Sequence, residues 1–268
     1  MSELKDTQNE HDDRQIAIDR VGVKALKFPL MVKDKGGDEQ RTVATVALAV
    51  DLPHHYKGTH MSRFVEVLNS HGNCLSVRDM AGLPRALLER LDAQRAHVEF
   101  LFPFFKSKPA PVTGHEGMMD YEVKFEIEAE KDGETDFIVT VMVPVATLCP
   151  CSKAISEYGA HNQRGVVTYS VRFKDPVWIE DLIARVESCA SCELYSLLKR
   201  PDEKAVTERA YENPVFVEDL VRNIALASNS DEQLRWYRVE AENFESIHNH
   251  NAYAVIETDL EKTSQNQV

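Results

Sequence analysis

The sequence predicts an α+β protein made of two successive ββααββ units, with antiparallel sheets and helices packed on one face. The predicted elements occur twice in the order strand, strand, helix, helix, strand, strand. A parallel sheet would need a crossover helix after each strand, and both halves lack one. The run at 42–63 also parallels the run at 137–164, because each contains an apolar strand, a polar connector, a Gly, a His and an Arg. This similarity indicates a duplication.

Composition places the ends of the two units. Residues 1–20 are polar and offer little to bury, so a flexible tail is expected there. The N-terminal unit is predicted at 21–131 and the C-terminal unit at 132–261. A second polar tail is expected at 262–268.

The N-terminal unit is expected to begin with a hairpin. Four strands are predicted from β-rich or alternating runs at 21–33, 41–50, 96–105 and 121–130. A helix is predicted from His60, where four apolar residues recur at helical spacing: Met61, Phe64, Val65 and Leu68. A second helix is predicted at 83–91, and a loop rich in Pro and Gly at 106–117.

The C-terminal unit repeats this order. Four strands are predicted at 136–145, 166–173, 233–244 and 252–258. Helical patterns cover 177–198 and 202–227, and the second has an apolar face of Val217, Leu220, Val221 and Ile224.

Charge and cysteine usage restrict the class of function. A net charge of −13 argues against a general nucleic-acid or membrane-surface binder, because both need a basic face. A nucleotide substrate would need a local basic pocket. No apolar run is long enough to span a bilayer, and residues 1–20 lack the apolar core of a signal peptide. A cytoplasmic protein is therefore expected, with its five cysteines reduced.

Residues 147–165 carry the densest chemistry of the chain. They read TLCPCSKAISEYGAHNQRG and lie between two β-rich runs. Cys149 and His161 offer a thiolate and an imidazole, which are good ligands for zinc and related divalent ions. Their spacing matches no closed four-ligand site, so an open, catalytic type of site is the better interpretation if a metal is bound. The alternative from spacing alone is a buried Cys and a hydrogen-bonded surface His.

The string CPCSKAISEYGAHNQRG resembles the signature of the prokaryotic type IB GTP cyclohydrolases, which are metal-dependent. The resemblance extends from about Gly22 to Leu260 and includes GTHMSRF at 58–64, YENP at 211–214 and ESIHNH at 245–250. It implies two tandem tunnelling-fold units per subunit and a homotetramer with sites near subunit interfaces. The implied reaction converts GTP to 7,8-dihydroneopterin triphosphate and formate, the first step of tetrahydrofolate biosynthesis.

The resemblance also implies a metal site and a substrate anchor. Cys149, His161 and Glu203 would hold a divalent ion, whether Zn, Mn or Fe. Judged locally, Asp202 or Glu203 would equally serve as a helix cap or dipole partner. Glu218 would accept the guanine N1–H and 2-amino group, although a glutamate at a helix N-terminus needs no ligand to explain it.

The segment at 245–250 supplies the remaining catalytic candidates. In the family, the matching Glu-x-x-His-x-His segment acts in catalysis, which implies roles for Glu245, His248 and His250 alongside Cys149. Two imidazoles and a carboxylate can relay protons near neutral pH. The alternative is a polar hairpin turn at the surface.

Several assignments stay open. The cations that would bind a triphosphate are not singled out, and the role of Cys151 is undecided. The CxxC at 189–192 is interpreted as structural. The nearest alternative function is the NADPH-dependent nitrile reductase of queuosine synthesis, whose thiol is a nucleophile. A non-catalytic purine- or pterin-binding module is a further alternative. A zinc nucleobase deaminase is disfavoured, because its Pro-Cys-x-x-Cys pair is absent.

Overall fold

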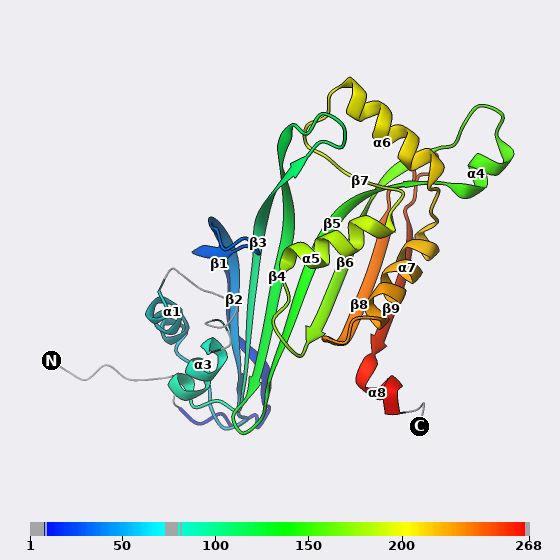
Figure 1. Ribbon diagram of the computed structural model, residues 1–268. Coiled ribbons are helices and arrows are strands. Elements are labelled where there is room, and N and C mark those ends of the chain that lie inside the picture. Colours follow the sequence, from blue (N-terminus) through cyan, green and yellow to red (C-terminus); the bar gives the residue numbers. More distant parts are fainter. Residues whose placement is uncertain (1–7, 9, 73–79, 81, 266–268) are drawn as a thin grey trace. The chain divides into compact units, whose positions relative to one another are not determined.

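The structure is a computed structural model that describes residue 8 and residues 10–72, 80 and 82–265 (Figure 1). Cys74 lies outside the described residues. The chain forms two compact units, one of Met1–Phe102 with Lys124–Ile138 and one of Pro103–Val123 with Val139–Val268. The predicted division of the sequence between residues 131 and 132 stays a prediction.

The first unit is built on three long antiparallel strands. β1 (Ile18–Lys33) pairs with β2 (Glu39–Leu52), and β2 pairs with β3 (Arg95–Pro109). β4 (Glu116–Glu130) follows β3 in the strand order, and its last residues also belong to this unit. Buried residues alternate with half-buried or exposed ones along β2 and β3, so one face of the sheet is buried and apolar and the other is more exposed.

Two helices cover the apolar face of the first unit. α1 (Met61–Ser70) packs beside α3 (Leu83–Leu91), whose bounds match the predicted helix. The buried face of α1 is formed by Phe64, Val67 and Leu68. Met61, which was predicted on that face, is 41% exposed because it is the first residue of the helix, where only one flank can pack.

Backbone hydrogen bonds join part of the N-terminal segment to residues 55–58. The Gly58 and Lys57 amides donate to the carbonyls of Gln8 and Glu10, and Asp12 N–H donates to His55 O, each at 3.1 Å. Residues 18–20 already belong to β1. The expected flexible tail therefore does not extend through residues 10–20. Polar side chains give little to bury, but they do not prevent backbone pairing.

The second unit continues with antiparallel strands. β5 (Thr135–Leu148) pairs with β6 (Asn162–Phe173), β6 pairs with β8 (Leu234–Asn243), and β8 pairs with β9 (Ala252–Asp259). A two-residue strand, β7 (Cys192–Glu193), pairs with β5. β3 and β4 run further than predicted, so the expected loop at 106–117 shrinks to a turn at 110–115. Ladder pairing overrides the weak strand propensity of the Lys and Ser residues there.

Helices of the second unit pack on one face of its strands (Figure 1). α5 (Ile179–Cys189) buries Leu182, Ile183 and Val186, and α7 (Val217–Asn229) buries Leu220, Val221 and Ile224. The other helices are α4 (Pro150–Ile155), α6 (Arg200–Glu212) and α8 (Leu260–Gln265).

Two helix predictions in this unit were too long. The pattern at 177–198 ends at Cys189, after which β7 begins. The pattern at 202–227 is split between α6 and α7 at Asn213 and Pro214. Proline lacks an N–H and disfavours helical geometry in the residue before it, which explains the break. Among the described residues, no helix is long and apolar enough to cross a membrane.

Candidate active site

Cys149 and His161 are neighbours at the point where β5 ends and β6 begins. Leu148 pairs with Asn162 in the ladder, and one step further the Cys149 N–H donates to the His161 carbonyl at 3.1 Å. Cys149 caps α4, and its Sγ accepts the Ser152 N–H at 3.4 Å. Pro150 suits the first helical position because its missing N–H would be unpaired there. The hairpin therefore brings together two residues that are twelve apart in sequence.

The ring of His161 is fixed by a buried amide. Gln163 Nε2 donates to Thr147 Oγ1 at 2.9 Å, which leaves Gln163 Oε1 to accept from His161 Nδ1 at 3.0 Å. In the neutral ring, Nδ1 therefore carries the proton and Nε2 carries the lone pair. A histidine oriented in this way through its second nitrogen is typical of metal ligands. Sequence reasoning missed this role of Gln163, although residues two apart on a strand face the same side.

The loop between β8 and β9 adds a carboxylate to this pair. Phe244 N–H donates to Arg164 O at 2.9 Å, which fixes the start of the loop. Glu245 Oε2 lies 3.9 Å from His161 Nδ1, and both side chains are mostly buried, at 14% and 16% exposure. Gly165 permits the close approach of β6 to β8 just before this loop, since a Cβ there would lie 2.5 Å from Asn243 Oδ1.

His248 and His250 form a stacked pair in the same loop. Their ring centroids are 4.9 Å apart and the rings are 13° from parallel. Both residues are exposed. Within the described part of the chain, no hydrogen bond or ion pair joins them to Glu245. The structure thus brings Glu245 to His161, and it brings the two histidines to each other.

Glu203 and Glu218 are exposed at the N-terminal ends of two helices. Glu203 lies in the first turn of α6 and Glu218 in the first turn of α7. Asp202, not Glu203, caps α6, because its buried carboxylate accepts the Lys199 N–H at 2.9 Å. The Glu203 side chain therefore does not cap the helix.

Three predicted metal ligands do not cluster within one chain. A metal-type group is taken as three His, Cys, Asp or Glu side chains whose ligand atoms all lie within 4.8 Å of one another. Among the described residues, the group that meets this criterion is His97, Glu99 and Glu126. Cys149 and His161 are joined by their backbones, whereas Glu203 stands on α6. The full set of Cys149, His161 and Glu203 stays a prediction.

Comparison with known proteins identifies the family. A family model described as "Type I GTP cyclohydrolase folE2" matches residues 4–254. The chain is 69% identical over 262 residues to a GTP cyclohydrolase FolE2 of Akkermansia muciniphila, covering 97% of this chain and 99% of that protein. It is 56% identical over 259 residues to one of Methylobacillus flagellatus, covering 97% of each. The chain belongs to the type I GTP cyclohydrolase FolE2 family.

It is therefore an enzyme of the GTP cyclohydrolase I type, as the motif at 149–165 predicted. This assignment favours the cyclohydrolase over the nitrile reductase and over the non-catalytic module.

Solved structures support the fold of this FolE2 chain. A uricase from Bacillus fastidious has a TM-score of 0.59 at 9% identity, covering 93% of this chain and 96% of that one. A uricase from Arthrobacter globiformis has a TM-score of 0.53 at 8% identity, covering 90% and 93%. Both are tunnelling-fold proteins, so the predicted α+β tunnelling fold is confirmed.

The candidate triphosphate cations of this FolE2 chain differ in whether they already have a structural partner. Lys153 donates to the Tyr211 carbonyl and lies 4.3 Å from the Tyr211 ring centroid, so it ties α4 to the end of α6. Arg164, Lys199 and Arg200 are exposed. Since Lys153 has a structural partner, the exposed cations are the better candidates for binding phosphate.

Asp202 anchors α6 of this FolE2 chain to the β3–β4 turn. Its carboxylate accepts the Val112 and Thr113 amides at 2.9 and 2.8 Å and the Thr113 hydroxyl at 2.7 Å. Burial raises the pKa of this carboxyl, but the hydrogen bonds outweigh burial and hold the pKa well below its ordinary value of 3.8. The charged form is therefore the one that the folded chain stabilises.

We expect Asp202→Asn to destabilise the protein at neutral pH. Folding lowers the pKa of the Asp202 carboxyl, so its charged form stabilises the folded chain. This contribution to the free energy of unfolding is complete above the ordinary pKa of 3.8 and is lost as pH falls through the folded-state pKa. The gap between wild type and variant in the free energy of urea unfolding should therefore narrow in acid. Glu212→Gln, an exposed change on the same helix, is the control. A gap that stays constant down to about pH 3 would contradict this account.

Proposed function

We propose that this chain catalyses the metal-dependent hydrolysis of GTP to 7,8-dihydroneopterin triphosphate and formate, the first step of tetrahydrofolate synthesis. The observation that carries the proposal is the arrangement of Cys149 and His161. The Gln163 amide leaves the His161 Nε2 lone pair available, and a backbone hydrogen bond holds Cys149 next to His161. The C-terminal half at 132–261 would carry most of the catalytic residues.

The donor set at this hairpin fits a divalent ion. A thiol and an imidazole with a preset tautomer suit Zn, Fe or Mn, in that order of preference for sulfur. Cys149, His161 and Glu203 would hold the ion. Glu203 is exposed, so its carboxylate is available to the site of its own chain or of a second copy. When bound, such an ion supplies a water of lowered pKa and a Lewis acid.

The remaining residues would bind the purine and move protons. Glu218 would accept the guanine N1–H and 2-amino hydrogens, which are two parallel donors that a carboxylate fits. Water would add at C8, the bond from C8 to N9 would break, and C8 would leave as formate after a second hydrolysis. His248 and His250, stacked in an exposed loop, would protonate the ring nitrogen that leaves C8. Glu245, whose Oε2 lies 3.9 Å from His161 Nδ1, would take part in the same proton transfer.

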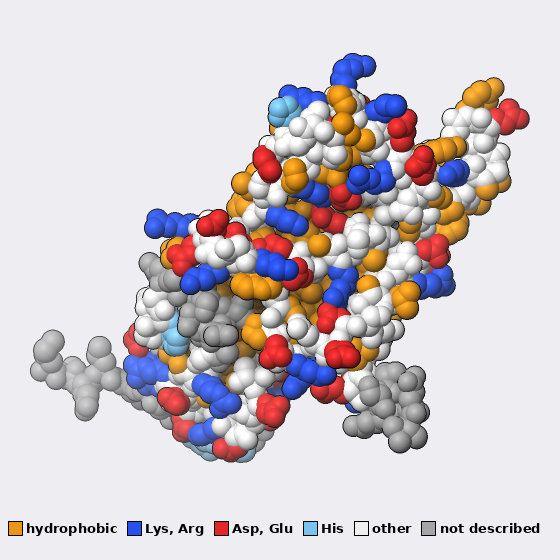
Figure 2. Space-filling model, in the orientation of Figure 1, with side chains coloured by type: hydrophobic (Ala, Val, Ile, Leu, Met, Phe, Trp, Pro, Cys, Tyr) orange, Lys and Arg blue, Asp and Glu red, His pale blue; other side chains and the backbone are white. Residues whose placement is uncertain are grey.

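The assembly we propose is a cytoplasmic homotetramer with sites near subunit interfaces, with neither nucleic acid nor membrane as a partner. The edge strand β9 exposes Tyr253 and Val255, and the α4 segment exposes Ile155 and Tyr158 at 80% and 97%. Figure 2 shows hydrophobic side chains gathered over the segment that carries α4. Apolar edges and patches of this kind favour contact with another copy.

The test is GTP turnover by metal-depleted protein before and after Zn²⁺, Mn²⁺ or Fe²⁺ is added back. We expect formate and a pterin triphosphate only after metal is restored. Turnover that is indifferent to metal, or GTP loss without formate, would refute the proposal. NADPH consumption with a nitrile substrate would favour the reductase alternative instead.

A further inference from the structure

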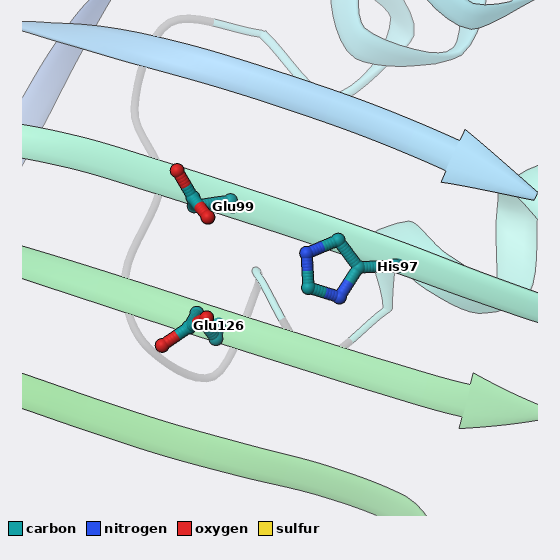
Figure 3. Close-up of side chains that lie close together, drawn as sticks. All are labelled: His97, Glu99 and Glu126. Carbon is teal, nitrogen blue, oxygen red and sulfur yellow. The ribbon is translucent and has the colours of Figure 1, made fainter. Parts of the chain in front are cut away.

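A second group of metal-type ligands lies on the more exposed sheet face of the first unit. His97 and Glu99 are on β3 and Glu126 is on β4, and one ligand atom from each lies within 4.8 Å of the others. All three are half-buried. Figure 3 shows the three side chains close together over the two strands. Because residues two apart on a strand share a face, the backbone itself holds this group in place.

The imidazole of His97 is oriented by a residue outside the group. Its Nδ1 lies 2.9 Å from Glu128 Oε1, and a carboxylate can only accept, so Nδ1 carries the proton. In the neutral ring, the lone pair then lies on His97 Nε2. Arg20 also donates to Glu128, which fixes that carboxylate in turn. A carboxylate behind a histidine is the arrangement that prepares an imidazole for a metal.

The neighbouring cavity has the charge that a cation requires. A cavity of about 220 Å³ is lined by His97 and Glu128 together with other charged side chains. Two arginines, Arg20 and Arg95, are outnumbered by the acidic lining residues, which are Asp19, Asp51, Glu128, Glu130, Glu134 and Asp136. A cavity with an excess of one sign of charge raises the local concentration of the opposite ion.

We propose that His97, Glu99 and Glu126 bind a divalent transition-metal ion, in a site that belongs to a different unit from Cys149 and His161. One nitrogen and two carboxylate oxygens make a harder ligand set than one that contains a thiolate, so this site favours Mn²⁺ more than the hairpin of Cys149 does. The Glu99 carboxylate makes no hydrogen bond or ion pair within the described residues. Lys124 Nζ lies 2.7 Å from Glu126 Oε2, which leaves the other oxygen of Glu126 for the ion.

The test measures Mn²⁺ binding to the full-length chain with the other predicted site disabled. Metal-stripped protein carrying Cys149→Ala and His161→Ala is titrated with Mn²⁺, and the free ion is quantified by its EPR signal. We expect this background to bind one ion per chain. Adding Glu99→Gln and Glu126→Gln should abolish that binding, and so should His97→Gln alone. Circular dichroism checks that each variant is folded.

Glu122→Gln is the matched control, since it removes one charge from an exposed position of β4. Binding should survive that change. Three outcomes would overturn the proposal: no Mn²⁺ bound by the background, binding unchanged in the ligand variants, or equal loss in the control. The last would indicate nonspecific attraction to surface charge.

Two further variants test how the site is built. Glu128→Ala should weaken Mn²⁺ binding about 10- to 100-fold, as expected for loss of an outer partner, whereas Glu128→Gln keeps an acceptor for His97 Nδ1 and should weaken it less. Lys124→Gln removes a competing cation and should tighten binding about two- to fivefold. Equal effects of the two Glu128 variants, or weaker binding in Lys124→Gln, would contradict this arrangement.

Discussion

Cys149→Ala is expected to lower kcat for GTP by about a thousandfold or more, because the proposed site would lose its thiolate ligand. A catalytic metal contributes several kcal/mol to the transition state, and each factor of ten in rate corresponds to about 1.4 kcal/mol. Formate release measures the rate. The metal content of the purified variant provides a second readout, which should fall together with kcat.

Cys151→Ala provides the control for this prediction. Cys151 is an exposed thiol in the same helix, two residues from the N-cap position that Cys149 occupies. Its loss should leave both rate and metal content close to those of the wild type. If the two cysteine variants behaved alike, or if Cys149→Ala kept its metal, Cys149 would not be the ligand that we propose.

Local sequence patterns predicted most of the fold, because the two faces of each strand differ in burial. The run YEVKFEIEAE at 121–130 alternates, and the structure buries its apolar side throughout β4. The helix at 83–91 begins with a Leu-Pro pair and has the predicted bounds. The predicted element bounds were wrong where strand pairing between segments distant in sequence determines the secondary structure. β3 extends through polar residues to Pro109, and the segment after Cys189 joins β5 as β7.

The candidate site was predictable where it is local and unpredictable where it is not. Cys149 and His161 meet because a hairpin closes between them, and the flanking β-rich runs made that hairpin visible in the sequence. The approach of Glu245 to His161 depends on the pairing of β6 with β8, across about eighty residues, which no local pattern specifies. The capping role fell to Asp202 because the β3–β4 turn supplies extra donors, and these come from ninety residues away.

His248→Ala is expected to lower kcat for GTP by about 10²- to 10⁴-fold, the usual contribution of a general acid or base. His248 is exposed in the loop after Phe244 and touches the His250 ring rather than the metal-type ligands at Cys149 and His161. Metal content should therefore stay at the wild-type level, and KM for GTP should change far less than kcat. This combination distinguishes proton transfer from loss of the metal or loss of substrate affinity.

His115→Ala is the matched control for His248, because His115 is another exposed histidine, in the turn that connects β3 and β4. It should leave kcat unchanged. Added imidazole should restore part of the activity of His248→Ala, since a small base can occupy the space that the ring vacates and transfer the proton. A variant that keeps the wild-type kcat would remove His248 from the mechanism. One that loses its bound metal would assign it to the metal site instead, and proton transfer would then have to be sought at His250.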